Sequence, residues 1–400
     1  MAEPRPRRLF GLLLAAGLLP ATASPAAESV RIAEEAIQPQ AAIDPSLAIH
    51  VVFIHRGNIA VATSRDRGRT FATPVTAIDA SGEARGGAQR GPRIGVDAKG
   101  RIHVTCPVVL DPGEIEKKYP TAELCLVSSS DGGHTWTKPT RVNEVEKNAP
   151  EALHWMVVEP SGTVHAAWLD RRRYKAGEPG QDIVYTRIAG GKADPNAVIV
   201  KDVCECCAPG LAVAPGGDVL VAYREGGPKP SREIWLSRRS SREERFGAPS
   251  RLNREPSLLR SCPMSAPAVA VSRDGKAVAA AWMDEASGER DARLSVAREG
   301  SFGAPETLGE DRSGRQDHPA LVFGDDGALW AAWEDGNRGK CRILYRCHVP
   351  ERAKVEEGSS RADGSAEFPA LAAGKGLVVL VYEASKDGDE SVHCRVLQAP

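Results

Sequence analysis

The chain has 400 residues, of which 42% are hydrophobic and 26% are charged, a balance typical of a globular protein rather than a disordered or fibrous one. Lys and Arg total 52 against 53 Asp and Glu, so the net charge of -1 provides no overall basic field for nucleic acid or an anionic membrane surface. Gly and Pro are frequent, at 39 and 29 residues, which favours many short strands over long helices. We therefore expect an all-β fold.

The N-terminal residues have the order of a secretory signal peptide. Arginines precede an apolar run from Leu9 to Leu19, and small residues follow it. The run is too short for a permanent membrane anchor, and no later stretch reaches the roughly 18 apolar residues of a membrane span. We expect residues 1–27 to be a leader and residues 28–400 to be one periplasmic or secreted domain. The Arg7-Arg8 pair also resembles a twin-arginine export signal, so the export route stays open.

One unit recurs along the rest of the chain at a spacing of roughly 50 residues, a period typical of propellers and solenoids. Each copy reads as a strand that begins near a Pro, a Gly turn, and a second strand that ends in an aromatic residue. Alternating apolar residues on both sides of a tight turn predict a β-hairpin. The copies begin at Pro39, Pro92, His154, Pro209, Pro267, Pro319 and Pro369.

A third and a fourth strand follow the hairpin. The third strands include Asn58–Ser64 and Glu123–Ser129, and the fourth opens with an aromatic residue and a Pro three residues later, such as Trp136 and Pro139. Four antiparallel strands per repeat make a propeller blade, so we predict a seven-bladed β-propeller, with a six-bladed sialidase-type propeller as the alternative. The last copy lacks a fourth strand, and we expect residues 29–36 to join the last blade and close the ring.

Two turns between third and fourth strands share a motif. Ser64–Phe71 and Ser129–Trp136 both read Ser-x-Asp-x-Gly-x-Thr-aromatic, in which Asp and Ser side chains satisfy turn amides and Gly takes a positive φ. With the leader and the blade pattern, these turns make nearly the whole mature chain resemble the sialidase-like Asp-box (BNR repeat) propellers. The resemblance implies the fold. The turns and the blade repeats alone are poor evidence for activity, because the same turn occurs in non-enzymatic members of that family.

Blade geometry predicts where a ligand would enter. The loop between strands two and three and the connection to the next blade project from the same face, which we call the funnel face. Loops of this kind often carry binding residues. The polar residues at the funnel mouth that we expect to bind a ligand are Arg90, His154, Arg172, Arg224, Glu225 and His318.

The resemblance to sialidases implies a specific active site. An exo-sialidase holds the substrate carboxylate with three arginines, attacks with a Tyr that a Glu activates, and protonates the leaving group with an Asp. The residues of this chain with matching types are Arg90, Arg172 and Arg224 for the clamp, Tyr382 with Glu383 or Glu225 for the nucleophile, and Asp170 or Asp284 for the acid.

Two features weigh against catalysis. The Phe-Arg-Ile-Pro signature of the family is absent, and the nearest string is Pro92-Arg93-Ile94-Gly95. Tyr382 occupies the aromatic position of the repeat, where other blades carry Trp, so a buried packing role competes with a catalytic one.

Nine cysteines in an exported chain indicate disulfides first. Cys106 and Cys125 fall near the ends of neighbouring predicted strands and suit one bridge, and Cys394 suits a bridge to Cys341 or Cys347 of the preceding blade. The other four fall on adjacent connections of the funnel face and are Cys204, Cys206, Cys207 and Cys262.

These four sulfurs leave two interpretations open. One or two disulfides would tie the connections together. Alternatively, thiolates with the thioether of Met264 and the imidazole of His318 suit Cu(I), so the cluster is a candidate copper site. The sequence requires no other cofactor.

We therefore expect an exported propeller that binds a small-molecule or glycan ligand at its central funnel. The alternatives are a glycoside hydrolase of the exo-sialidase type and a periplasmic copper-binding protein that uses the Cys and Met cluster. A protein partner is compatible with all three, whereas the balanced charge argues against nucleic acid and the hydropathy against a membrane span.

Overall fold

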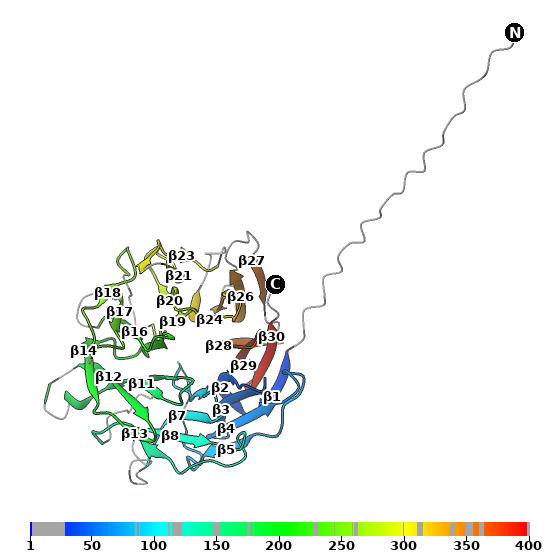
Figure 1. Cartoon of the computed structure of the whole chain (residues 1–400), viewed down its shortest axis with the longest axis vertical. Coiled ribbons are helices and arrows are strands. Elements are labelled where there is room, and N and C mark those ends of the chain that lie inside the picture. Colours follow the sequence, from blue (N-terminus) through cyan, green and yellow to red (C-terminus); the bar gives the residue numbers. More distant parts are fainter. Residues whose placement is uncertain are drawn as a thin grey trace.

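The computed structural model of the chain is a ring of antiparallel β-sheets (Figure 1). It describes residue 1 and residues 29–397, apart from residues 85, 88, 111–112, 114–121, 147–152, 174–176, 179, 227–230, 244, 258, 260–262, 299, 310–314, 337–340, 349–354 and 360–363 and the side chains of 355–359. Within these residues, no helix is long and apolar enough to cross a membrane.

Seven sheets form seven blades, which confirms the predicted seven-bladed β-propeller. Blade 1 contains β2 (Ala36–Ile43), β3 (Ile49–His55), β4 (Asn58–Ser64) and β5 (Val75–Ile78). Blade 2 contains β6 (Arg93–Val96), β7 (Ile102–Val108), β8 (Glu123–Ser129) and β9 (Thr140–Arg141). Blade 3 contains β10 (His154–Val158), β11 (Val164–Asp170), β12 (Gln181–Ala189), β13 (Lys192–Ala193) and β14 (Ala197–Val203).

The second half of the ring follows the same pattern. Blade 4 contains β15 (Gly210–Val213), β16 (Val219–Arg224), β17 (Ile234–Arg239) and β18 (Ser250–Arg251). Blade 5 contains β19 (Ala268–Val271), β20 (Ala277–Asp284), β21 (Asp291–Arg298), β22 (Ser301–Phe302) and β23 (Glu306–Thr307). Blade 6 contains β24 (Gln316–Phe323), β25 (Leu329–Asp335), β26 (Arg342–His348) and β27 (Val355–Ser359), and blade 7 contains β28 (Ser365–Gly374), β29 (Leu377–Lys386), β30 (Asp389–Leu397) and β1 (Val30–Glu34).

The two ends of the chain meet in blade 7. β1 pairs antiparallel with β30, with Val30 opposite Cys394 and Glu34 opposite Ser391 (Figure 1). A strand from the start of the chain thus forms the outer strand of the last blade. Without β1, the backbone of β30 would be an open sheet edge available to other chains.

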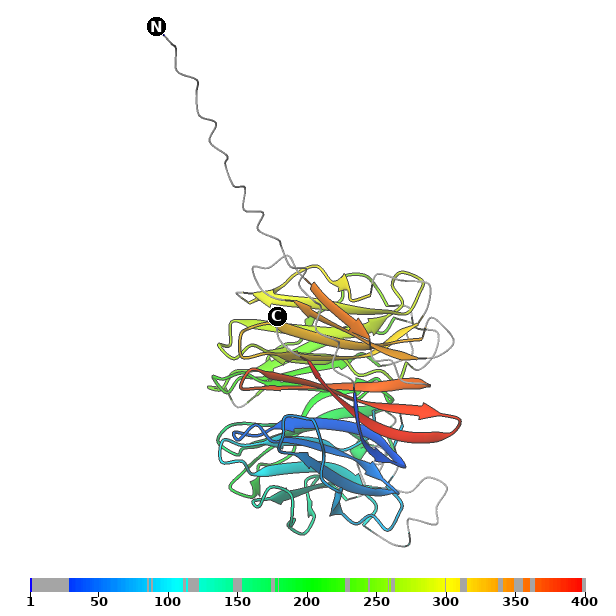
Figure 2. The same ribbon diagram turned by 90° about the vertical axis from the view of Figure 1, so that its right-hand side faces the viewer.

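The core lies between neighbouring blades. Figure 2 shows the sheets stacked face to face from the side. Apolar residues of blades 7 and 1 pack together around Phe53 and Val381, and those of blades 6 and 7 pack around Trp330 and Tyr382. Because side chains alternate along a strand, each blade buries one set of residues against each neighbour. The sheets therefore hold each other in place around the ring.

The two matching turns form the same hydrogen-bonded loop. Asp66 accepts the Ser64 hydroxyl at 2.8 Å and the Thr70 amide at 2.9 Å. Asp131 accepts the Ser129 hydroxyl at 2.7 Å and a backbone amide at 3.0 Å. The hydrogen bonds from Thr70 lower the pKa of Asp66 to about 2. These loops lie away from the funnel face and stabilise the turn between the outer strands.

The disulfides expected outside the funnel face are not formed. Cys106 and Cys125 lie directly opposite each other on β7 and β8, yet both are free thiols in the core between blades 1 and 2. Cys347 packs between blades 6 and 7, whereas Cys394 packs between blades 7 and 1, so blade 7 itself separates the two sulfurs. These cysteines act as small apolar core residues. The predicted bridges among Cys106, Cys125, Cys341, Cys347 and Cys394 are therefore wrong.

Removal of β1 tests the closure of the ring. We expect a chain that starts at Ala36 to lose on the order of 3 kcal/mol of unfolding free energy, because backbone hydrogen bonds worth about 1 kcal/mol each and the packing of Ile32 disappear. It should also self-associate through the exposed edge of β30. A chain that starts at Ser29 is the matched control. Chemical denaturation and light scattering check both, and equal stability of the two chains would refute the role of β1.

Candidate functional site

The centre of the ring is filled by side chains rather than open. The residue Gln89, in the connection before blade 2, accepts the backbone amide of Ala266, before blade 5, at 2.7 Å. The guanidinium of Arg93 on β6 lies 4.5 Å from the ring centre of Trp155 on β10. One cavity at the centre has a volume of about 50 Å³, and its lining includes Gln38, Gln89, Arg93, Trp155 and Phe368. A volume of this size is too small for a sugar ring.

Three residues at this centre adopt a left-handed backbone directly before a proline. The φ angle is 57° at Gln38, 46° at His318 and 53° at Phe368. A β-bulge shifts the strand register at the same three places. A non-glycine residue rarely adopts this conformation, which costs about 1 kcal/mol or more and persists only where its surroundings enforce it.

Carboxylates of the preceding blade enforce it at two of these positions. Glu334 on β25 accepts the amide of Phe368 at 2.6 Å. Glu383 on β29 accepts the amide of Gln38 at 3.0 Å. Both glutamates directly follow the buried aromatic residue that the repeat places on its second strand. The same repeat position thus makes the same bond between consecutive blades.

His318 pairs with one of these glutamates. Its Nδ1 lies 2.8 Å from Glu334, and its Nε2 lies 3.1 Å from the carbonyl oxygen of Met264. Burial lowers the pKa of His318, but the charges of Glu334 and Asp317 outweigh burial and raise it to about 9. The imidazole is therefore protonated at neutral pH, with Nδ1 in an ion pair with Glu334 and Nε2 at hydrogen-bond distance from the carbonyl oxygen of Met264. The imidazole has no lone pair for a metal or a ligand, which separates it from the sulfur cluster.

Glu383 has no comparable cation. Burial, with the nearby carboxylates of Glu390 and Glu367, raises the pKa of Glu383 to about 7. The side chain is half-buried at the junction of blades 7 and 1. A carboxyl group that exchanges its proton near neutral pH is suited to acid–base chemistry.

The structure does not form the sialidase-like pair of Tyr382 and Glu383. Neighbouring side chains on β29 point to opposite faces of the sheet. The hydroxyl of Tyr382 donates to Ser29 at 2.8 Å, and its ring stacks on His393 at 5.5 Å within the core between blades. Tyr382 is fully buried, and burial raises its pKa. Glu383 points instead toward blade 1.

The expected arginine clamp is occupied by contacts within the protein. Arg172 is bidentate on Asp170, at 2.8 and 3.1 Å. Arg224 is 1% exposed and donates to the carbonyl oxygens of Met283 at 2.6 Å and Arg232 at 3.3 Å. Arg90 is half-buried and also has a partner. Arg172 already pairs with a carboxylate, and Arg224 is almost fully buried, so neither is arranged as a clamp for a substrate carboxylate.

The remaining predicted residues also serve the blades. Asp170 accepts the indole N–H of Trp168 at 3.1 Å, and Asp284 accepts that of Trp282 at 2.9 Å. Asp284 also pairs with Arg293 at 3.4 Å. His154 is fully buried, with its Nε2 3.0 Å from the hydroxyl of Thr105. Glu225 is half-buried, and its backbone forms an isolated antiparallel β-bridge with Val203.

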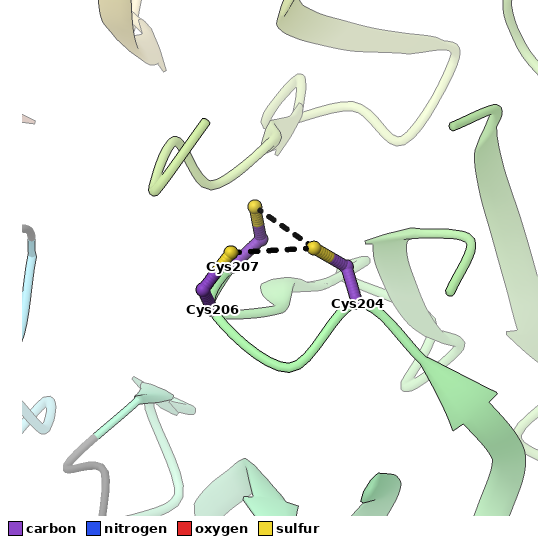
Figure 3. A group of neighbouring side chains, drawn as sticks. All are labelled: Cys204, Cys206 and Cys207. Carbon is purple, nitrogen blue, oxygen red and sulfur yellow. Dashed lines mark hydrogen bonds between the residues drawn. The ribbon is translucent and has the colours of Figure 1, made fainter. Parts of the chain in front are cut away.

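The sulfur cluster does form. Cys204, Cys206 and Cys207 follow the end of β14 in the connection to blade 4, with their sulfurs within 4.8 Å of one another (Figure 3). The sulfur of Cys204 lies 3.5 Å from that of Cys206 and 3.6 Å from that of Cys207. Cys206 is disulfide-bonded, whereas Cys204 and Cys207 are free thiols. The predicted member Cys262 lies outside the described residues.

The two free thiols differ in acidity. The hydrogen bond with Cys207 lowers the pKa of Cys204 to about 6 despite burial. Burial raises the pKa of Cys207. The disulfide interpretation thus applies to Cys206, whereas Cys204 and Cys207 are available to bind a metal.

Sequence analysis missed the open cavity of the funnel face. A volume of about 1180 Å³ lies over the junction of blades 7 and 1. Its polar lining comes from β1, the β3–β4 turn and the hairpin between β29 and β30, and includes Arg31, Glu35, Arg56, Lys386, Glu390 and His393. The Asp387-Gly388 pair, with φ of 56° and 95°, was the available signal, because Asp-Gly typically forms the two-residue turn of a projecting hairpin.

Comparison with solved structures agrees with the fold. A polysaccharide lyase, an ulvan lyase bound to a saccharide, matches with a TM-score of 0.62 at 11% identity, over 93% of this chain and 96% of the lyase. A protein of unknown function from Dyadobacter fermentans matches with a TM-score of 0.52 at 14% identity, over 94% of this chain and 98% of that protein. An α-L-arabinanase of Penicillium chrysogenum complexed with arabinobiose matches with a TM-score of 0.50 at 14% identity, over 92% of this chain and 98% of the arabinanase.

At these identities the likeness shows a shared β-propeller fold. No family model matches the chain, and no curated protein sequence matches it.

The imidazolium of His318 predicts a pH dependence of stability. Its pKa is raised in the folded state, so its contribution is complete below the unfolded value of about 6.5 and is lost as the pH rises through 9. We expect His318→Gln to lower the unfolding free energy by on the order of 3 kcal/mol at pH 6 and far less at pH 10. Denaturant titrations of both proteins across this range check it, and a constant difference would contradict it.

Proposed function

We propose that this chain is an exported β-propeller that binds a saccharide on its funnel face, in the cavity between blades 7 and 1. One observation carries the proposal. The cavity at the centre of the ring has a volume of about 50 Å³, whereas this cavity offers about 1180 Å³. Ligand sites commonly occupy about 300–1,000 Å³, so the cavity has room for more than one sugar ring.

The lining suits a ligand rich in hydroxyl groups. Charged side chains form ion pairs on the rim, with Arg31 to Glu34 at 2.8 Å and Arg56 to Glu35 at 2.9 Å. Such pairs hold donors and acceptors in defined positions, where they can hydrogen-bond to a polar ligand. His393 lies at the base of the cavity, with its ring stacked on Tyr382. Ion pairs that already exist also limit the side-chain entropy lost on binding.

Two of the similar solved structures support this choice. The ulvan lyase and the arabinanase were both solved with a saccharide bound. Their fold can therefore hold such ligands, although their chemistry belongs to their own residues. The N-terminal leader expected at residues 1–27 would deliver the protein to a compartment where polysaccharides occur.

Binding without hydrolysis fits the contacts better than a sialidase-type reaction. Arg172 and Arg224 are engaged by a carboxylate and by carbonyl oxygens, and Tyr382 is buried on the face of β29 opposite Glu383. A clamp and nucleophile of that type would require these contacts to break. Glu383, whose pKa is raised to about 7, accepts the amide of Gln38 and is not among the residues that line the cavity.

A saccharide screen tests the proposal. We expect the mature chain to bind at least one neutral or uronic-acid oligosaccharide with micromolar to millimolar affinity, and Lys386→Ala to weaken that binding at least tenfold because Lys386 lines the cavity. Lys276→Ala is the matched control, because Lys276 is 85% exposed on a turn at the opposite face. Calorimetry measures both.

Two outcomes would refute it. One is the absence of binding across the screen, and the other is an equal loss in Lys386→Ala and Lys276→Ala. The same screen includes an aryl sialoside, and release of its aryl group would replace binding with hydrolysis.

A further inference from the structure

The buried cation beside the sulfur cluster is the unexplained feature of the funnel face. Two other arginines on this face have carboxylate partners, Arg172 with Asp170 at 2.8 Å and Arg290 with Asp317 at 3.1 Å. Arg224 is 1% exposed, and no carboxylate among the described residues pairs with it. Its Nε atom is buried without a hydrogen-bond partner. A buried charge of this kind is costly unless an opposite charge compensates it.

The sulfurs are the groups that can supply that charge. Arg224 interacts electrostatically with both Cys204 and Cys207. Its backbone carbonyl also accepts the amide of Cys204 at 3.0 Å, which ties the start of the cysteine connection to the end of β16. Cys204 and Cys207 are 1% and 4% exposed, so their thiolates would share the low-polarity environment of the guanidinium.

We propose that Cys204 and Cys207 form a two-thiolate site for Cu(I), with Arg224 as its counter-ion. Two thiolates that bind one Cu(I) from opposite sides at about 2.3 Å stand about 4.6 Å apart, and these sulfurs are 3.6 Å apart, so each side chain moves outward by about 0.5 Å when the ion binds. A small separation of the two side chains accommodates the ion. Cys206 is disulfide-bonded and offers no thiolate.

Charge and donor number select the metal. Soft thiolate donors favour Cu(I), Zn²⁺ or iron–sulfur clusters. Two thiolates and Cu(I) carry a net charge of -1, which the single Arg224 guanidinium neutralises, whereas the same thiolates with Zn²⁺ are neutral and leave Arg224 uncompensated. Structural Zn²⁺ takes four ligands and iron–sulfur clusters take four cysteines. Among the described residues, no histidine or carboxylate joins the group of Cys204, Cys206 and Cys207.

Access to the ion comes from the funnel face. Cys206 is half-buried beside the two thiols, so the connection that carries them borders solvent on one side. His318 is excluded as a third ligand because both of its ring nitrogens are engaged. This site is separate from the saccharide cavity, whose lining comes from blades 7 and 1.

Anaerobic titration of the mature full-length protein with Cu(I), against a chromophoric Cu(I) chelator, tests the proposal. We expect one Cu(I) per chain and an ultraviolet thiolate-to-copper absorption. Cys204→Ala and Cys207→Ala should each lower the affinity at least 100-fold. Cys341→Ala is the matched control, because Cys341 is a free, half-buried thiol in blade 6 and should leave the affinity within twofold.

Two further variants separate the assigned roles. Cys206→Ala should keep the affinity within fivefold, because its sulfur is not a ligand. Arg224→Met should lower the affinity about tenfold while it leaves both thiols in place. Thermal unfolding without metal identifies any variant that fails to fold, and the comparison is made among folded variants only.

Three results would overturn the proposal. They are failure of the wild-type protein to hold Cu(I) against the chelator, an equal loss in Cys341→Ala or Cys206→Ala, and a Cys204–Cys207 disulfide in protein isolated from the export compartment. The last is measured by thiol counting and peptide mass mapping. None of these results depends on saccharide binding.

Discussion

Seven inner strands that converge on one axis impose the constraint on which this molecule depends. The strands cannot all continue straight at the centre, so β2, β24 and β28 each bulge and place a non-glycine residue in a left-handed conformation before a proline. The cost of these conformations is offset by bonds from the neighbouring blade, as in the contact from Glu334 to Phe368. Side chains therefore occupy much of the centre, and the larger cavity lies in the outer part of the funnel face.

One repeat position makes inter-blade contacts in three blades. The residue after the buried aromatic is Arg224 in blade 4, Glu334 in blade 6 and Glu383 in blade 7, and each of them contacts the next blade. Both glutamates accept an amide of the first strand of the next blade, whereas Arg224 donates to the carbonyl oxygen of Met283 on the second strand of blade 5. Glu334 meets a cation, Glu383 meets carboxylates, and Arg224 meets neutral carbonyl oxygens. Different charges and different hydrogen-bond partners therefore arise from equivalent positions on one scaffold.

Much of the architecture could be predicted because the repeat is written in local patterns. The Pro-strand-Gly-strand unit fixed the number of blades, and the same unit placed Cys204, Cys206 and Cys207 on one connection of the funnel face. Both predictions depend only on strand order and on which loops share a face. The Asp-Gly pair between β29 and β30 carried equivalent information about the open cavity and was overlooked.

The roles of single side chains could not be predicted in this way, because they depend on distances across strands. Arg172 has the residue type that an arginine clamp requires, but it forms an ion pair with Asp170 at 2.8 Å. Cys347 and Cys394 lie in consecutive repeats, but they pack on opposite sides of blade 7. Residue type predicts which chemistry is available, whereas register and facing decide whether it is satisfied within the fold.

That distinction identifies where chemistry remains for a ligand. A paired group such as Arg172 has already gained the electrostatic energy that a ligand would offer, so binding there must first break a native contact. A buried group without its opposite charge has that energy still to gain. Arg224 is such a group, because it lies beside two free thiols and has a buried Nε without a hydrogen-bond partner. Glu383 is a weaker example, because the groups near it are other carboxylates. Sites for a charged ligand such as a metal ion are therefore expected on this propeller at positions where the charge balance of the repeat is incomplete rather than where charged residues are most numerous.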